Sequence, residues 1–591
     1  MCGIIGYCGK KAAVPIILEG LRCLEYRGYD SAGIASLCQG RLIVKKDVGK
    51  LDEVIEKHNL ASLPGNIAIG HTRWATHGGV TQANAHPHCD CSGRIAVVHN
   101  GIIENNQQLR HELIQKGHRF NSETDTEVIP HLLEDELKKG FSLTQATLNI
   151  TGRLQGSYAF IATSLDDPGK IVGARKDSPL VVGIDLPDCY ISSDALAFSR
   201  YADTVMSLGD GEVVMIAPGK VEFFDSHGRK LHKQPRKLDQ TWIQSHKNGY
   251  QHFMLKEIME QAEILNETLC QDEKKFTEIA LDILRARQVI ITACGTSRYA
   301  ALVGRYLFSK VGRKFCDVVM ASEFGYFADS VDRNTLVIAV SQSGETADVV
   351  DGVKAARNAG AQIVSIVNRP NSILTDLSHQ VIYLNCGPEI AVAATKSFLS
   401  QLAIFYLLSF SMVNAFAEAA ANLKSLSGAI TQALDSNKSE IIRLSQKFKD
   451  KNDFYYIARG INFAIASEAA LKLKEISYIH AEGMPAGELK HGTLALIEPG
   501  TPVVVICPAD YTFAETLNNA MEAKSRGAFI IAVSDAENTI YDSWLKIPRV
   551  NELLYPMVTV LPLQLLAYYL AIARGYDPDK PRNLAKSVTV K

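Results

Sequence analysis

The sequence predicts a multidomain protein of the α/β and α+β classes, with a strand-rich first part followed by two similar α/β domains. The chain has 591 residues, which is more than one ordinary domain contains. Residues 1–235 hold short β-type runs between Gly and Asp turns. The remainder alternates strand and amphipathic-helix patterns, and the pattern repeats after about 165 residues, the interval between Val289 and Phe454.

Strands in the first part are expected where short apolar runs occur. These runs are Ile67–Ile69, Ile95–Val98, Tyr158–Ala162, Leu180–Ile184 and Val213–Ile216. The polar, basic stretch from His227 to Asn248 lacks apolar periodicity and indicates a linker.

The repeated part predicts two parallel sheets, each covered by helices on both faces. Val289–Gly295 and Leu336–Val340 are continuous β-branched runs, each followed by a helical pattern, as in parallel sheets. The corresponding runs in the second copy are Phe454–Gly460 and Val503–Ile506. Ligands of such sheets bind beyond the carboxyl ends of the strands.

Two uncharged runs, Ser397–Ala417 and Leu553–Ala573, are long enough to span a bilayer. Each ends one copy of the repeat and contains polar residues or prolines, so we expect buried helices. The resulting domain limits are 1–235 for the first domain, 236–250 for the linker, 251–420 and 421–576 for the two α/β domains, and 577–591 for a C-terminal tail.

Composition excludes several functional classes. Lys and Arg number 62 and Asp and Glu 64, for a net charge of −2, so a nucleic-acid or acidic-membrane partner is not expected. The 12 cysteines form no CxxC pair, and no signal peptide precedes Cys2. We therefore expect reduced thiols in the cytoplasm.

Cys2, directly behind Met1, is the first candidate for chemistry. Loss of Met1 would leave one residue with a thiol and an α-amino group, whose pKa values lie near ~8.5 and ~7.7–8.0. An N-terminal nucleophile enzyme uses this arrangement, because the amine helps to activate the attacking group. Many chains begin with Met-Cys by chance, so the motif needs support from other residues.

Two further segments of the first part support amide chemistry. His71-Thr72-Arg73-Trp74-Ala75-Thr76-His77-Gly78 and His99-Asn100-Gly101 each follow a short strand. The Asn100 side chain beside the Gly101 N–H can form an oxyanion hole. Arg73 and Asp125 can hold the carboxylate and amino group of an amino acid.

The segment His86-Pro87-His88-Cys89-Asp90-Cys91 contains several metal-ligating residue types. These residues crowd into one short loop with no distant partner, unlike the separated ligand pairs of zinc sites. We therefore expect no metal ion and no cofactor.

The first α/β copy carries an anion-binding pattern. Ser341-Gln342-Ser343-Gly344-Glu345-Thr346 lies between a buried strand and a helix over Ala347–Asn358. Hydroxyls and free N–H groups at a helix N-terminus bind phosphate, although Ser and Thr also cap helices for structural reasons alone. Cys294-Gly295-Thr296-Ser297-Arg298 ends the neighbouring strand and is expected to supply sugar contacts. The absence of GxxxxGK[ST] and GxGxxG argues against a nucleotide.

The second copy places its charged residues on its first helix. Glu468, Lys472 and Glu475 share one face, either as a solvated salt-bridged surface or as an acid–base site. His491 lies in a loop between Gly487 and Gly492, where an exposed histidine is the simpler interpretation.

These motifs together resemble the glutamine–fructose-6-phosphate aminotransferases nearly end to end. The resemblance is carried by CGIIG at Cys2, RGYDSAG at Arg27, HTRWATHG, HNGIIENN, SETDTEV, ACGTS, SQSGET, AATK, LKLKEISYIHAE, GELKHG and PRNLAKSVTV. It implies an N-terminal nucleophile (class II glutaminase) αββα domain, followed by two doubly wound parallel α/β sugar-isomerase (SIS) domains and a catalytic tail. It also implies a homodimer.

The resemblance implies the following residue roles. In the glutamine site, Cys2 is the nucleophile, and Asn100 and Gly101 form the oxyanion hole. The substrate is bound by Arg73, Trp74, Thr76, His77 and Asp125. Trp74 is also the gate of an ammonia channel. For fructose 6-phosphate, Ser341, Gln342, Ser343 and Thr346 hold the phosphate, and Thr296, Ser297, Val392 and Lys472 contact the sugar. Lys586 forms a Schiff base, Glu475 moves a proton between C1 and C2, and His491 opens the ring across the dimer.

Three positions depart from the family pattern. Ala394 stands where serine is common, Thr493 where proline is usual, and Ala469-Ala470 replaces a glycine-containing pair. The proposed catalytic groups are all present. The implied reaction converts fructose 6-phosphate and glutamine to glucosamine 6-phosphate and glutamate, the first step of amino-sugar synthesis. The alternatives are a related SIS isomerase or deaminase, another glutamine amidotransferase, and a sugar-phosphate-sensing module.

Overall fold

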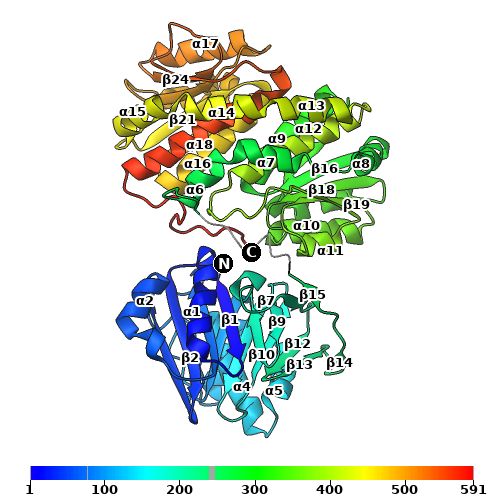
Figure 1. Cartoon of the computed structure of the whole chain (residues 1–591), viewed down its shortest axis with the longest axis vertical. Coiled ribbons are helices and arrows are strands. Elements are labelled where there is room, and N and C mark those ends of the chain that lie inside the picture. Colours follow the sequence, from blue (N-terminus) through cyan, green and yellow to red (C-terminus); the bar gives the residue numbers. More distant parts are fainter. Residues whose placement is uncertain (1, 76, 239–246, 590–591) are drawn as a thin grey trace. The chain divides into compact units, whose positions relative to one another are not determined.

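The computed structural model describes residues 2–75, 77–238 and 247–589, without the side chain of Tyr26. The chain forms two compact units (Figure 1), which are Met1–Gln244 with Ser587–Lys591, and Ser245–Lys586, taken over their described residues.

Two antiparallel sheets form the first unit. The eight-stranded sheet has the order β15-β11-β9-β10-β1-β4-β2-β3. Its strands are β1 (Gly3–Cys8), β2 (Ser31–Cys38), β3 (Arg41–Val48), β4 (Ile67–Arg73), β9 (Val181–Asp185), β10 (Asp188–Ser192), β11 (Thr204–Ser207) and β15 (Arg236–Lys237). The seven-stranded sheet has the order β14-β13-β12-β8-β7-β6-β5. Its strands are β5 (His88–Cys89), β6 (Ile95–Ile103), β7 (Gly156–Ser164), β8 (Ile171–Lys176), β12 (Val213–Ala217), β13 (Lys220–Phe224) and β14 (Lys230–Leu231).

Alternating side chains of these strands pack on opposite faces. In β1, Ile4 contributes to the core between the two sheets, whereas Ile5 faces a second core shared with helices α1 (Ala13–Leu24) and α2 (Leu51–His58). In β6, Ala96 joins the central core and Val97 faces a third core. The helices of this third core are α3 (Asn106–Gln115), α4 (Val128–Lys138) and α5 (Leu143–Thr151). This is the four-layer αββα arrangement that the resemblance implied.

The second unit contains two five-stranded parallel sheets of the same topology. Their orders are β17-β16-β18-β19-β20 and β22-β21-β23-β24-β25, so each strand has a counterpart at the same place in the other sheet. The strands are β16 (Gln288–Ala293), β17 (Asp317–Met320), β18 (Thr335–Ser341), β19 (Gln362–Val367), β20 (Gln380–Tyr383), β21 (Asp453–Ala458), β22 (His480–Pro485), β23 (Pro502–Ile506), β24 (Phe529–Ser534) and β25 (Ser543–Lys546).

Both faces of each parallel sheet are buried. In β18, Ile338 packs into one core and Val337 into another; in β23, Val504 and Val505 divide in the same way. This explains why the strands are continuous apolar runs rather than alternating ones.

The helices of this unit are α6 (Phe253–Met259), α7 (Gln261–Thr268), α8 (Glu273–Arg285), α9 (Gly295–Lys310), α10 (Ala347–Asn358), α11 (Ile373–Leu377), α12 (Lys396–Ser411), α13 (Phe416–Ser425), α14 (Ser427–Asp435), α15 (Lys438–Phe448), α16 (Phe463–Ser477), α17 (Phe513–Lys524) and α18 (Tyr555–Ala573).

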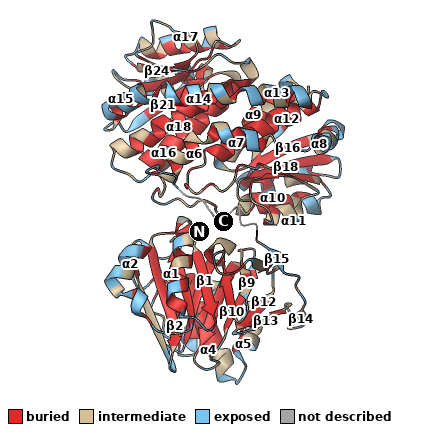
Figure 2. Ribbon diagram, viewed as in Figure 1, coloured by how far each residue is buried: buried red, intermediate tan, exposed pale blue. Residues whose placement is uncertain are grey.

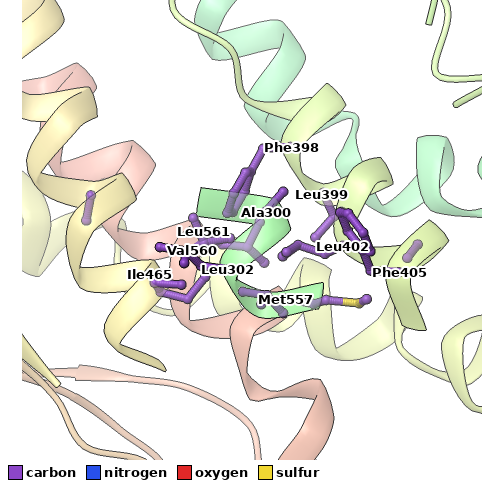
Figure 3. Packing of buried hydrophobic residues seen from close by; sticks show 14 of the residues in the cluster. Ala300, Leu302, Phe398, Leu399, Leu402, Phe405, Ile465, Met557, Val560 and Leu561 are labelled. Carbon is purple, nitrogen blue, oxygen red and sulfur yellow. The ribbon is translucent and has the colours of Figure 1, made fainter. Parts of the chain in front are cut away.

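One hydrophobic cluster joins the two parallel-sheet domains. Helices α9, α12, α16 and α18 meet in it, and Figure 3 shows Leu302, Leu402, Ile465 and Leu561 among its members. Because this core is continuous, the two domains form one unit rather than separate bodies.

The long apolar runs are core helices, as expected. Helix α12 is almost wholly buried (Figure 2). The segment Glu552–Ala573, which includes α18, is long and apolar enough to cross a membrane, but 83% of its most apolar window is buried inside the protein. Pro562 lies within α18 without ending it. An apolar helix buried on all sides is typical of the core of a large protein.

The limits of the linker and of the C-terminal tail in the structure differ from the predicted limits. Within the predicted linker stretch, β14 pairs with β13 and β15 pairs with β11, so residues up to Lys237 extend the first unit's sheets. Residues 239–246 lie outside the described part of the chain. In the tail, Lys586 belongs to the second unit and Ser587 to the first. A polar composition does not exclude edge strands, because their outer sides are solvated.

Candidate functional site

Cys2 is positioned by the pairing of β1 with β4. Gly3 lies opposite Thr72 in this pair, which brings Cys2 beside the residues that follow β4. The backbone N–H of Trp74 donates to Cys2 Sγ at 3.2 Å, and the thiol lies 3.4 Å from the Trp74 carbonyl oxygen. Burial raises the pKa of the Cys2 thiol, and the Trp74 N–H acts in the opposite direction.

Asn100 reaches Cys2 from the other sheet. It lies on β6, and its Nδ2 donates to the Cys2 carbonyl oxygen at 2.8 Å. Asn100 Oδ1 lies 3.2 Å from His71 Nε2, which fixes the amide orientation. At Gly101, φ is +117° and a Cβ would lie 2.1 Å from the Ser157 carbonyl oxygen, so this position requires glycine. The predicted oxyanion pair therefore lies beside the predicted nucleophile.

Arg73 and Asp125 are buried near the same place. Arg73 donates to the carbonyl oxygens of His77 at 2.5 Å and Gly79 at 3.2 Å, which holds the loop after β4. Burial lowers the pKa of Arg73, and the nearby charges of Cys2, Asp30 and Asp125 oppose that effect. Thr76 lies outside the described residues.

Asp30 is a residue of this site that the sequence patterns did not single out. Its Oδ2 accepts from the Ala75 N–H at 2.8 Å, so it supports the loop that carries Trp74. Asp125 Oδ2 in turn accepts from the Ile103 N–H at 2.8 Å, which ties the Asp125 turn to the end of β6. The only sequence signal for Asp30 is its place in the RGYDSAG motif.

The histidine-rich loop divides between two environments. His86 stacks on His71 with ring centroids 4.0 Å apart. His88 Nε2 lies 3.1 Å from Thr124 Oγ1. Burial lowers the pKa of His71 to about 3 and that of His86 and His88 well below its usual range. These rings are therefore neutral, and they pack behind the Cys2 site.

Cys91 points elsewhere, toward His118, His131 and Glu134. The expectation that the cysteines and histidines of this loop have no distant partner was wrong for Cys91. Its partners come from the segment after α3 and from α4, and no local pattern links those segments to the loop.

The predicted phosphate loop lies at the carboxyl end of β18. Ser341 Oγ and Thr346 Oγ1 are 2.9 Å apart, and the Gly344 N–H donates to Ser341 Oγ at 3.1 Å. The Glu345 N–H donates to Ser343 Oγ at 3.2 Å. Gln342 also lies in this turn, and α10 begins directly after it. Hydroxyl groups and the start of a helix therefore converge at the sheet edge where ligands of α/β domains bind.

Thr296 and Ser297 lie in the first turn of α9, which follows β16, the neighbour of β18 in the sheet. Thr296 Oγ1 donates to Glu468 Oε1 at 3.2 Å. Gln401 Nε2 donates to Ser297 Oγ at 2.9 Å. The first contact joins the end of one parallel-sheet domain to helix α16 of the other.

The charged face of α16 is buried rather than solvated. Lys472 Nζ lies 3.6 Å from Glu468 Oε1 and also contacts Glu475 Oε2. Glu468 is 0% exposed and Lys472 is 1% exposed. Burial raises the pKa of Glu468 to about 8, and the Lys472 ammonium opposes this rise. A buried, shifted carboxyl group beside a lysine is a candidate functional site rather than a surface salt bridge.

Lys586 lies against Glu389, a residue that the sequence analysis missed. Lys586 Nζ is 2.5 Å from Glu389 Oε2, and Glu389 Oε1 accepts from the backbone N–H groups of Thr395 and Ser397 at 2.9 and 3.1 Å. Burial alone would raise the pKa of Glu389, but the Lys586 ammonium lowers it to about 2. In the same loop, the Val392 N–H donates to the Asp579 carbonyl oxygen at 3.4 Å.

Among the described residues that are predicted to act on the sugar, His491 has no hydrogen bond or ion pair with Lys472, Glu475 or Lys586 of the same chain. It ends the 3₁₀ helix η9 (Ala486–His491) and is exposed.

Two family models match the chain. A glutamine amidotransferase domain matches residues 71–199, and a SIS domain matches residues 282–411 and 447–574. Curated relatives named glutamine–fructose-6-phosphate aminotransferase (isomerizing) align over 100% of both chains. The protein of Pyrococcus horikoshii is 46% identical, that of Thermococcus kodakarensis 45%, and that of Methanothermobacter thermautotrophicus 44%.

Solved structures match the second unit's fold. The C-terminal domain of glucosamine-fructose-6-phosphate aminotransferase from Francisella tularensis is 35% identical, with a TM-score of 0.53 over 57% of this chain and 100% of that one. A putative tagatose-6-phosphate ketose/aldose isomerase from Clostridium novyi NT, 19% identical with a TM-score of 0.51, covers 57% of this chain and 93% of its own. At that identity the likeness concerns the fold alone.

Proposed function

We propose residue roles from one premise, that this chain belongs to the glutamine–fructose-6-phosphate aminotransferase (isomerizing) family. The observation that carries the premise is 46% identity over the full length of both chains. The protein transfers ammonia from glutamine to fructose 6-phosphate with isomerisation, and it yields glucosamine 6-phosphate and glutamate.

In the glutaminase half, the Cys2 sulfur attacks the glutamine amide, and ammonia leaves as a thioester forms. Water then hydrolyses the thioester to glutamate and frees Cys2. Once Met1 is removed, the α-amino group of Cys2 accepts the thiol proton. Asn100 Nδ2 and the Gly101 N–H stabilise the oxyanion, and the fixed orientation of Asn100 against His71 supports this role. Arg73 and Asp125 bind the two charged groups of the amino-acid end, with Trp74, Thr76 and His77 forming the rest of the binding loop.

In the isomerase half, the sugar phosphate binds the Ser341–Thr346 turn. We assign the phosphate contacts to Ser341, Gln342, Ser343 and Thr346, and the sugar contacts to Thr296, Ser297 and Val392. The hydroxyl groups around the start of α10 support this assignment, because phosphate is favoured at a helix N-terminus.

Lys586, Glu475, Lys472 and His491 carry out the sugar chemistry. The Lys586 amine forms a Schiff base with the C2 carbonyl of the ketose, which releases water. Ammonia from the glutaminase reaction displaces the Lys586 amine from this Schiff base and leaves an imine at C2. Glu475 then moves a proton between C1 and C2, and Lys472 holds the Glu475 carboxylate. His491 opens the ring and acts from the second subunit of a homodimer, a proposal supported by its exposed position in this chain.

Glutaminase turnover with and without fructose 6-phosphate tests the function. Sugar-stimulated glutamine hydrolysis and formation of glucosamine 6-phosphate are expected. A sugar-phosphate-sensing module would instead bind the sugar without turnover. A bare SIS isomerase or deaminase would leave glutamine intact.

A mixing experiment tests the homodimer and the role of His491. We expect His491→Ala and Lys586→Ala each to lack synthase activity, and the mixture, after subunit exchange, to regain part of it. Exchange is verified with differently tagged chains. Full exchange without recovered activity would contradict a site shared between subunits.

We place the enzyme in the cytoplasm, because the 12 cysteines, all in the described part of the chain, are free thiols.

A further inference from the structure

Four side chains of the first unit converge on one point away from Cys2. They are Cys91, in the turn between β5 and β6, His118, in the segment after α3, and His131 and Glu134, both on α4. Their ligand atoms all lie within 4.8 Å of one another. Three separate segments of the chain therefore contribute to one cluster of sulfur, nitrogen and oxygen atoms.

Five of the six distances between these atoms match the edges of a metal tetrahedron. Cys91 Sγ lies 3.6 Å from both His118 Nδ1 and His131 Nδ1, and the two nitrogens are 3.2 Å apart. Glu134 Oε2 lies 3.1 and 3.5 Å from the same nitrogens. Zinc bonds of about 2.3 Å to sulfur and about 2.0–2.1 Å to nitrogen and oxygen give tetrahedral edges of about 3.6 and about 3.3 Å.

Each histidine Nδ1 in the cluster faces both Cys91 Sγ and Glu134 Oε2. The Cys91 backbone N–H donates to Glu134 Oε2 at 3.3 Å and holds the carboxylate beside the thiol. The other ring nitrogen of His118, Nε2, lies 2.9 Å from Asp135 Oδ1. A cation at the centre of the cluster accepts a lone pair from all four ligand atoms at once.

The surroundings also suit a bound cation. The Arg119 N–H donates to Cys91 Sγ at 3.3 Å, a contact that a metal-bound thiolate can accept. The carboxylate of Asp135 on His118 Nε2 is the outer partner usually found behind a metal-bound histidine. His131 Nε2 is buried without a hydrogen-bond partner in the described residues; it lies 3.8 Å from Glu127 Oε1.

We propose that Cys91, His118, His131 and Glu134 form a closed tetrahedral site for a structural Zn²⁺ ion. Thiolate and imidazole ligands select zinc over magnesium or calcium. With four protein ligands the site has no open position, which is typical of structural rather than catalytic zinc.

The ion joins the turn at Cys91 and the segment at His118 to helix α4. Directly before α4 lies the turn Asp125–Glu127, which carries a proposed glutamine-binding residue. The site therefore stabilises the fold on one side of the glutaminase half without touching substrate.

Metal analysis of the full-length protein, purified without a metal-affinity step, tests the proposal. About one zinc per chain is expected by mass spectrometry. After chelation, Co²⁺ should give a thiolate charge-transfer band and intense visible bands of a tetrahedral centre. Added Zn²⁺ should raise Tm, because it binds only the folded chain.

Variants of the cluster locate the ion. Cys91→Ser should remove the charge-transfer band and the retained zinc, and Asp135→Asn should weaken zinc binding by about 10–100-fold. Cys270→Ser and His111→Ala, at an exposed thiol and a surface imidazole, are matched controls and should keep one zinc per chain.

Three results would overturn the proposal. One is a wild-type protein that is metal-free and cannot compete with a micromolar-affinity chelator for Zn²⁺ or Co²⁺. Another is unchanged zinc affinity in both Cys91→Ser and His118→Ala. The third is loss of zinc in the control variants. Variants that fail to fold leave the wild-type stoichiometry and cobalt spectrum as the deciding measurements.

Discussion

The Lys586 ammonium and the Glu389 carboxylate form a buried ion pair, with Nζ 2.5 Å from Oε2, although the residues are 197 positions apart in the chain. Both side chains are withdrawn from water, at 6% and 0% exposure. Glu389 is itself fixed by backbone N–H groups of the loop that begins α12. The pair therefore holds the C-terminal segment, and the proposed Schiff-base nitrogen, against the isomerase domain.

Removing the charge of Glu389 should slow synthesis. Glu389→Gln keeps the shape of the side chain but loses a charge-assisted hydrogen bond worth about 1.5–3 kcal/mol. If the pair positions Lys586 in the transition state, kcat for glucosamine 6-phosphate should fall by about 10–100-fold. Glu418→Gln, at an exposed position on α13, is the control. Unchanged synthesis in Glu389→Gln would argue against a positioning role.

Replacing Lys586 should separate the two reactions. Lys586→Ala removes the amine that we propose forms the Schiff base, so synthesis from either glutamine or ammonia should be lost. Some hydrolysis of glutamine should remain, because Cys2 is intact. The measurement is product formation beside glutamate release, with borohydride trapping of the sugar adduct in the wild type. Full synthase activity in the variant would remove the Schiff-base assignment.

Replacing Cys2 should have the complementary effect. Cys2→Ala should abolish glutamate release while isomerisation of fructose 6-phosphate continues, because the proposed groups for that step lie in the second unit. Cys23→Ala is a suitable control, since Cys23 lies on α1 outside the proposed site. Loss of both reactions in Cys2→Ala would contradict two separate sites.

Asn100 should matter for glutaminase rate more than for binding. Asn100→Ala removes one proposed oxyanion donor, and loss of such a donor typically costs about 10²–10³-fold in kcat. The KM for glutamine should change much less, because the proposed binding groups Arg73 and Asp125 remain. Steady-state glutaminase assays with Asn149→Ala on α5 as control test this expectation. An equal loss expressed only in KM would indicate ground-state binding instead.

Glu468 should make stability depend on pH. Burial raises its folded pKa to about 8, above an unfolded value of ~4.3. The folded state therefore binds the proton more tightly, and this contribution is complete below pH ~4.3 and declines as the pH rises toward 8.

Glu468→Gln removes that contribution. The quantity to follow is the difference in Tm, wild type minus variant. As the pH rises from 5 to 8 this difference should decrease by about 2 °C or more, and above pH 8 it should change little. Thermal unfolding in buffers of equal ionic strength provides the measurement. A difference that stays constant with pH would show that Glu468 is ionised throughout.

The αββα fold of the first domain was predicted only through the family resemblance. The doubled second half was predicted directly from local sequence patterns. The apolar runs at Val289 and Val503 are continuous because both faces of their sheets are buried. The spacing of Glu468 and Lys472 placed them on one helical face, but not whether that face is buried. Burial depends on which element packs against the helix, and a local pattern does not contain that information.

The sequence by itself determined the elements, the repeat, the family motifs and most candidate residues, because these depend on spacing along a few consecutive residues. The tertiary structure alone decided which distant groups meet. Glu389 pairs with Lys586, and Cys91 meets His118 and His131, only because strand order and helix packing bring their segments together. Neither contact leaves a periodic signal, since a pair of polar residues has no preferred separation in the chain.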